Sequence, residues 1–264
     1  MSPVYLLVCC CGVVCNTERA MKKFLINLVC CFVPSGKMRH KIRRFAKRTK
    51  SRNNIIEIVK ADGRRVRVKR VPGCRFDFTG DNNHVVLHEP LGKLTLDVNV
   101  SWGVYIELGT STQWQRKIRI VKQFGNKETN RVVIGDELKT TAMVNILLGH
   151  GGGDVIIGDD CMFAVDVVFR TGDFHTIYST DDGRVLNFNQ SINIGNHVWL
   201  GERVLVLKGA RVSDNSIVGA RSLVNKKFEQ SNIIIAGVPA RIVKENVNWD
   251  KRPPYHYALD NGQV

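Results

Sequence analysis

The sequence lacks an apolar run long enough to cross a bilayer, and it contains few prolines. Its two apolar runs, residues 4–15 and 24–34, are both shorter than the roughly 20 residues that a transmembrane helix needs. Neither run has the charged start and small-residue cleavage site of a secretory signal. Proline occurs 7 times and glycine 23 times in 264 residues, and 24% of the residues are charged. These values exclude a collagen-like or wholly disordered chain.

Cysteines in a regular spacing are also missing. Six of the eight cysteines lie at or before Cys31, inside the apolar runs, and only Cys74 and Cys161 come later. Adjacent cysteines in apolar runs form neither a disulfide framework nor a C-x-x-C metal site. We therefore expect a reducing, cytoplasmic compartment.

Acidic residues are almost absent from the N-terminal segment that ends at Arg70. This segment has 18 Lys and Arg against three Asp and Glu, whereas the rest of the chain has 21 of each, so the segment carries the whole net charge of +15. We predict a basic N-terminal arm at residues 1–70 that contains a short apolar helix. The Met-Lys-Lys at residues 21–23 is typical of a translation start, which leaves open whether residues 1–20 are translated.

Nine of these cations are concentrated in residues 35–52. A short apolar helix followed by such a cluster is typical of a peripheral anchor on an anionic membrane surface, here the inner face of the cell membrane. A solvated tail and a helix packed on the domain stay open as alternatives. No zinc-finger, RRM or helix-turn-helix pattern accompanies the charge, so no nucleic-acid partner is expected.

An aliphatic residue recurs at every sixth position from Ile134 onward, often followed by a small residue. The clearest register consists of Ile194, Leu200, Val206, Val212, Val218 and Val224. Neither a helix (period 3.6) nor a single strand (period 2) produces this spacing. It predicts a chain that turns a corner every six residues, so that three hexapeptides form one triangular coil. The aliphatic residues point inward, and the coils stabilise one another only as a stack.

These segments resemble the hexapeptide-repeat acyltransferases over residues 134–243. The resemblance is carried by IGNHVWLG (194–201), VLKGA (206–210), IVGARSLV (217–224) and the ending AGVPAR (236–241). It implies an all-β fold, a left-handed parallel β-helix. Alternating strands at residues 80–87 and 104–108 place the start of this domain near residue 75, so we assign it to residues 75–243 and a C-terminal tail to 244–264.

The repeat is interrupted between Phe169 and Ile194, whose separation in the sequence is not a multiple of six, and we expect a projecting loop there. The loop resembles the Asp-x-His-x-Ile-Tyr loop of family members that acetylate sugars and capsule or lipopolysaccharide components. The resemblance implies that His175 is the general base, a task for which imidazole is suited. Asp173 would fix the tautomer of His175 or bind the acceptor sugar. The alternatives are that Asp173 is an ordinary turn residue and that His175 is an ordinary exposed loop histidine.

The resemblance further implies a homotrimer with acetyl-CoA bound in a groove between two subunits. Trp199, which follows the loop in the sequence, would border the acyl donor and could donate its indole N–H to the thioester oxygen; a packing role at the subunit interface stays open. The other donor-site residues implied are Gly201, Gly219, Ala220, Ser222, Lys226, Lys227 and Arg241. The family often has Thr-Lys where this chain has Asn225-Lys226-Lys227, so which lysine meets a CoA phosphate is open.

We therefore expect an acetyl-CoA-dependent O-acetyltransferase that acts without a metal on a sugar hydroxyl of capsular polysaccharide or lipopolysaccharide. An N-acetyltransferase of an amino sugar and a non-catalytic trimeric scaffold are the alternatives. A zinc carbonic anhydrase of the same fold needs a close histidine pair, whereas no two of His150, His175 and His197 are close in the sequence. No P-loop, Rossmann fingerprint or G-x-S-x-G elbow is present. The acceptor sugar and its hydroxyl stay open.

Overall fold

The computed structural model describes residue 38 and residues 52–122 and 129–264. Residues 52–264 form one compact unit built almost entirely of short strands. The helix expected in the basic arm falls outside the described residues.

The strands of this unit form three sheets, named here A, B and C. Sheet A contains, in spatial order, β2 (Arg65–Arg67), β1 (Ile55–Val59), β4 (His84–His88), β6 (Val104–Leu108), β8 (Asn130–Ile134), β11 (Val155–Ile157), β14 (Ile192–Ile194), β17 (Arg211–Val212) and β20 (Lys227–Phe228). Sheet B contains β19 (Leu223–Val224), β16 (Leu205–Leu207), β13 (Val168–Arg170), β10 (Val144–Leu147), β7 (Gln115–Lys122), β5 (Lys93–Val100) and β3 (Cys74–Phe78). Sheet C contains β22 (Ala240–Glu245), β21 (Ile233–Gly237), β18 (Ile217–Val218), β15 (Trp199–Leu200), β12 (Met162–Phe163) and β9 (Lys139–Thr140).

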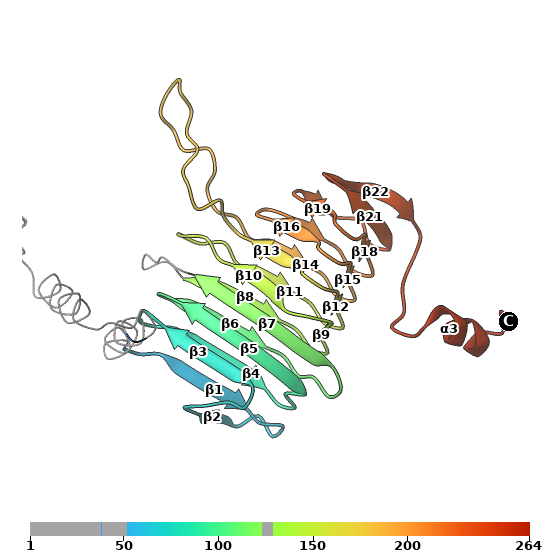
Figure 1. Cartoon of the computed structure of the whole chain (residues 1–264), viewed down its shortest axis with the longest axis horizontal. Helices are drawn as coiled ribbons and strands as arrows, with labels where there is room; N and C mark the ends of the chain where they lie inside the picture. Colours follow the sequence, from blue (N-terminus) through green and yellow to red (C-terminus); the bar gives the residue numbers. More distant parts are fainter. Residues whose placement is uncertain (1–37, 39–51, 123–128) are drawn as a thin grey trace, which may run out of the picture. The chain divides into compact units, whose positions relative to one another are not determined.

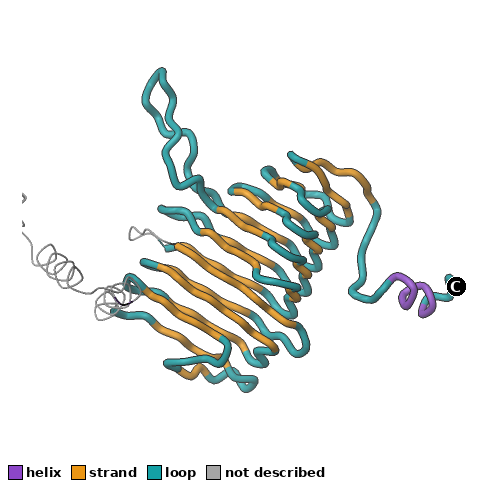
Figure 2. Tube along the Cα trace, viewed as in Figure 1, coloured by secondary structure: helices purple, strands orange, loops and turns teal. Residues whose placement is uncertain are grey.

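From β8 to β21 the chain visits sheets A, C and B in turn, and each strand from β10 to β21 pairs in parallel with the strand one coil earlier. The antiparallel pairs are β1–β2 at one end of the stack and β21–β22 at the other. The coils are seen stacked along the molecule in Figures 1 and 2. The fold is a left-handed parallel β-helix, as the sequence predicted.

The sixfold register is confirmed by burial. All six residues from Ile194 to Val224 in that register are buried, as are the corresponding residues of the preceding coils such as Ile134 and Phe169. In the last coils each residue pairs with the one three hexapeptides later, for example Asn193 with Arg211 and Trp199 with Ile217. Three hexapeptides therefore complete one coil there, and their aliphatic side chains fill its interior.

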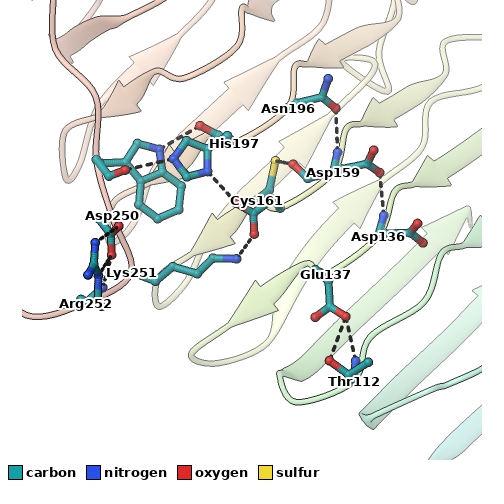
Figure 3. A network of polar contacts seen from close by, with 12 residues as sticks. Thr112, Asp136, Glu137, Asp159, Cys161, Asn196, His197, Asp250, Lys251 and Arg252 are labelled. Carbon is teal, nitrogen blue, oxygen red and sulfur yellow. Dashed lines mark hydrogen bonds and ion pairs between the residues drawn. The ribbon is translucent and has the colours of Figure 1, made fainter.

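A column of Asp and Asn side chains joins the coils where sheet A turns into sheet C. We call it the corner ladder; its members are Asp136, Asp159, Asn196 and Asp214. The Oδ1 atom of each accepts a hydrogen bond from a backbone N–H of the coil before it, at 2.6–2.8 Å; two of these bonds are drawn in Figure 3. Glycine precedes three of the four, and a Cβ at Gly195 would stand 2.1 Å from Asp214 Oδ1. The small residues after the aliphatic positions therefore make room for the ladder.

The domain starts earlier than the sequence predicted. β1 pairs in parallel with β4, so the ordered sheet begins at Ile55 and not near residue 75. The boundary was wrong because the first coils have no sixfold spacing: Ile55 pairs with His84 and His84 with Tyr105, and these two separations are unequal and neither is a multiple of six. Part of the charge assigned to the arm therefore belongs to the β-helix, where Arg65 and Arg67 flank Glu57.

The chain after β22 turns back along the stack. Residues 246–252 contact the corner where sheet A turns into sheet C, and α3 (Pro254–Asp260) follows with no buried residue. Among the described residues, no helix combines the length and the apolar character needed to span a bilayer.

Candidate active site

The expected loop occupies residues 171–191 and leaves the stack where sheet B turns into sheet A, between β13 and β14. It projects well beyond the coils (Figure 1). Its outer part is a small hairpin, closed by an antiparallel bridge between Tyr178 and Val185 and a 2.9 Å bond from the Ser179 N–H to the Arg184 carbonyl. A turn-supporting bond from the Arg184 N–H to Asp182 Oδ1 closes the tip.

The base of the loop is fitted closely to the coils. The Asn189 side chain donates to the carbonyl of His150, and its Oδ1 stands 2.0 Å from where a Cβ of Gly172 would lie. A Cβ at Gly209 would stand 2.3 Å from Gln190 Oε1. These glycines admit the returning limb of the loop, so its two ends are fixed to the stack.

Asp173 is held by an ion pair rather than by the imidazole. Its Oδ2 accepts hydrogen bonds from Lys208 Nζ at 2.5 Å and from Asn187 Nδ2 at 3.0 Å. These bonds, led by that from Lys208, hold the pKa of Asp173 below its ordinary value. Lys208 also donates to the Asn187 carbonyl at 3.0 Å, so one lysine joins the two limbs of the loop to β16.

His175 lies between these anchors with its side chain exposed. Its backbone carbonyl accepts a 2.7 Å hydrogen bond from Asn187 Nδ2, and the Asn187 Oδ1 accepts from the Ile177 N–H at 2.8 Å. Within residues 52–122 and 129–264, no hydrogen bond to the His175 imidazole is found. The structure therefore gives Asp173 partners other than the imidazole, and it fixes the His175 backbone while its ring is open to solvent.

Trp199 lies on a different face. It is on β15 in sheet C, where Leu200 points into the core and the Trp199 side chain points outward with 38% of its area exposed. The corner between sheets B and A, which carries the His175 loop, is opposite sheet C across the core of a triangular coil. One chain therefore does not bring His175 and Trp199 together.

The expected donor-site residues divide into two groups. Gly201, Gly219, Ala220 and Ser222 follow the strands of sheet C, and Arg241 lies on β22 of the same sheet. Lys226 and Lys227 are exposed near the start of β20 in sheet A. Close stacking accounts for part of the first group: a Cβ at Gly201 would stand 2.7 Å from the Ala220 nitrogen, and Ser222 is buried with its Oγ accepting from the Gly237 N–H.

Two residues of the loop site, Asn187 and Lys208, were missed by the sequence analysis. Lys208 sits in the outward half of a hexapeptide, where an exposed cation is ordinary. Asn187 opens the segment Asn187-Phe188-Asn189-Gln190 at the end of the loop, and its three amide side chains were the available signal. Neither contact could be read from spacing, because Lys208 lies 35 residues from Asp173.

In the described ranges, no three His, Cys, Asp or Glu side chains are grouped so as to hold a metal ion. The site consists instead of an exposed imidazole on a rigidly attached loop. Such a group can accept a proton from a hydroxyl brought to it and return the proton to a leaving group.

Comparison with known proteins agrees with this fold. No family model matches the chain. A polysialic acid O-acetyltransferase of Neisseria meningitidis is 44% identical over 107 residues, which is 40% of this chain and 49% of that protein. WcaF of Escherichia coli K12, named for colanic acid biosynthesis and acetyl transfer, is 30% identical over 138 residues, which is 50% of this chain and 75% of WcaF.

The chain belongs to the hexapeptide-repeat acetyltransferase family. The fold of this family is also seen in the solved polysialic acid O-acetyltransferase OatWY, which superposes with a TM-score of 0.52 at 24% identity over 81% of this chain and 99% of that one. In sequence, this chain matches about half the length of the Neisseria polysialic acid O-acetyltransferase.

Proposed function

We propose that this acetyltransferase-family protein transfers an acetyl group from acetyl-CoA to a hydroxyl of a sugar in a cell-surface polysaccharide. The observation that carries the proposal is the placement of His175. Its side chain is exposed, and its backbone carbonyl accepts a hydrogen bond from Asn187 beside the Asp173–Lys208 ion pair. Family membership supports acetyl transfer, and the names of two relatives, for polysialic acid and colanic acid, support a polysaccharide acceptor.

The chemistry is a direct transfer. An unprotonated nitrogen of His175 takes the proton of the sugar hydroxyl as its oxygen attacks the thioester carbonyl. The tetrahedral intermediate collapses, the C–S bond breaks, and the imidazolium returns the proton to the departing CoA thiolate. The products are an O-acetyl ester and CoA, and the imidazole ends in its starting protonation state.

The complete site in this proposal lies between two copies of the chain. His175 projects from the corner opposite sheet C, while Trp199 faces outward from sheet C. A neighbouring copy can bring its own sheet C to the loop, and three copies related by a threefold axis give each loop one such neighbour. The loop carries exposed apolar residues suited to that contact, namely Ile177, Tyr178, Leu186 and Phe188.

Acetyl-CoA would lie along sheet C of that neighbouring copy. Trp199 would contact the pantetheine arm, and the closely stacked turn at Gly201 and Gly219 leaves the backbone accessible beside it. Arg241 is exposed on the same sheet and would meet a phosphate.

The test is transfer of radiolabelled acetyl groups from acetyl-CoA to a panel of acceptors that includes oligosialic acid, neutral galactosides and an amino sugar. We expect labelled product that loses its label in mild alkali, because an ester hydrolyses where an amide does not. Alkali-stable label on the amino sugar alone would instead favour the N-acetyltransferase. CoA-independent or absent transfer across the panel would overturn the proposal.

A further inference from the structure

The segment after β22 is bound by a set of specific contacts to the corner where sheet A turns into sheet C, beside Trp199 of β15. Residues 246–252, called the strap here, place the Trp249 indole on the His197 ring with centroids 4.2 Å apart and planes 9° from parallel. Trp249 Nε1 donates to the His197 carbonyl at 2.8 Å. Two residues further on, Lys251 pairs with Asp160 and lies over the Trp114 ring. Figure 3 shows Lys251 of the strap extending toward the side of the stack that carries His197, while Asp250 is bonded to Arg252 within the strap.

Both ring nitrogens of His197 lie within hydrogen-bond distance of an oxygen atom. Nδ1 lies 2.7 Å from Asp160 Oδ2, and Nε2 lies 3.0 Å from the Trp249 carbonyl oxygen. A carboxylate and a carbonyl oxygen both accept, and a neutral imidazole has only one N–H to donate. Both bonds form together only when His197 is an imidazolium, which the stacked indole also favours through its negative face.

The other charged groups around His197 support an ionised Asp160. Burial alone would raise the pKa of Asp160, but the hydrogen bonds from Lys251 and His197 outweigh it and hold that pKa below the ordinary value. Asp250 of the strap adds a further negative charge near His197 and is itself paired with Arg252. Lys251 is the cation that faces the site from the strap, and Asp160 neutralises it.

The strap also determines what surrounds Trp199. The rings of Trp249 and Trp199 are 6.0 Å apart and inclined at 46°, so they form two sides of an apolar corner on sheet C. Trp199 stays partly exposed beside the strap. Movement of the strap would remove one side of this corner and leave Trp199 alone.

We propose that Trp249 is a positioning residue of the acyl-donor site: the strap, latched through a protonated His197, holds the Trp249 indole against Trp199 and fixes the aromatic wall that the donor contacts. This inference rests on the proposed function, which places acetyl-CoA along sheet C. It also makes the donor site sensitive to pH. Deprotonation of His197 removes one of its two hydrogen bonds, and protonation of Asp160 in acid removes the negative charge that the His197 ring faces.

The first experiment measures acetyl-CoA binding by calorimetry and steady-state kinetics with the full chain. Trp249→Ala should weaken binding about three- to tenfold, the scale of one aromatic contact, and raise KM more than it lowers kcat. Trp249→Phe, which keeps an aromatic ring but loses the Nε1–H, should recover part of the affinity. Tyr255→Ala on α3 is the matched control and should bind like the wild type.

The second experiment follows the latch. Asn is favoured at the positive φ of 53° that His197 adopts, so His197→Asn keeps the backbone conformation at this position. The Asn amide does not titrate, so the variant loses the group whose protonation the proposal requires. The ratio of wild-type to His197→Asn affinity cancels titration of the CoA phosphates. That ratio should fall as pH rises from about 5 to about 8, the range in which histidines lose their proton.

The outcomes separate the two proposals. If the wild type binds no acetyl-CoA, the proposed function fails and the inference fails with it. If the wild type binds and Trp249→Ala binds equally well, the function stands and the positioning role is wrong. A lowered melting temperature of Trp249→Ala with unchanged affinity would mean that the strap only stabilises the fold. A flat affinity ratio across the pH range would contradict the protonated latch.

Discussion

At the scale of single residues, the account depends on His175 being free to exchange a proton while its backbone is held still. Asn187 provides that restraint from the opposite limb of the loop, and Lys208 connects both limbs to β16. A base on a fixed loop can meet a hydroxyl in the same geometry at each turnover, which is where much of the gain from orientation arises.

Replacing the base should separate catalysis from binding. His175→Ala should lower kcat by about 10²- to 10⁴-fold, the usual contribution of a general base, with acetyl-CoA affinity unchanged in calorimetry. His256→Ala on the exposed helix α3 is the matched control. Near-normal turnover by His175→Ala would remove His175 from the mechanism.

The ion pair that anchors the loop should show its own pH dependence. Because the pKa of Asp173 is lowered in the fold, its contribution is complete above the ordinary carboxyl value and is lost as pH falls through the lowered value. Asp173→Asn should therefore speed hydrogen exchange of the Ile177 amide at neutral pH and lower kcat/KM by about tenfold. In strong acid the variant and the wild type should exchange alike. Asp181→Asn at the loop tip should change neither property, and a neutral-pH exchange rate equal to wild type in Asp173→Asn would contradict the anchor.

At the scale of elements, the coils differ in how much of their structure could be predicted from the sequence. From β14 to β19 each strand repeats after three hexapeptides, so the inward residues recur in sequence as they do in space. Upstream, β5 and β7 are longer strands, and Lys93 pairs with Gln115 at a separation that is not a multiple of six, which erases the sixfold spacing. There the alternation of buried and exposed positions was visible, but the start of the domain at β1 was not.

The loop shows a similar division. Its existence and its histidine could be predicted, because the repeat breaks there and the motif lies inside the break. The partners of Asp173 could not, because they depend on how the returning limb at Asn187 meets a lysine one coil later. The strap could not be predicted either, since Trp249 and His197 are 52 residues apart and no repeat connects them.

The corner ladder makes a testable contribution to stability. Asp214→Ala removes the acceptor for the Asn196 N–H, which should cost about 1 kcal/mol and lower the melting temperature by about 2–4 °C. Asp214→Asn keeps an Oδ1 acceptor, as Asn196 does in the preceding coil, and should melt close to wild type. Equal destabilisation by both variants would mean that the ladder bond is not what Asp214 contributes.

At the scale of the whole molecule, positive charge is concentrated in the N-terminal segment: residues 1–51 have 11 Lys and Arg against one Glu, whereas residues 52–264 have 28 Lys and Arg against 23 Asp and Glu. The arm up to residue 51 should hold the protein at an anionic membrane surface through about 1 kcal/mol per basic residue. Salt shortens the Debye length from about 10 Å at 0.1 M to about 3 Å at 1 M. The full chain should therefore sediment with vesicles containing anionic lipid at low salt and be released at high salt. A chain that starts at Arg52 should not sediment, and equal binding by both chains would refute the anchor.

The central claim is that one copy supplies His175 and another supplies Trp199 to a single acetyl-transfer site. The direct measurement is acetyl transfer by His175→Ala and Trp199→Ala chains, assayed each alone and then after co-expression. Each alone should be strongly impaired, because every site in its assembly lacks one of the two residues. The mixed assembly should recover about a quarter of wild-type activity, since random mixing pairs an intact His175 with an intact Trp199 at that frequency. No recovery in a mixed assembly shown to contain both chains would contradict a site shared between copies.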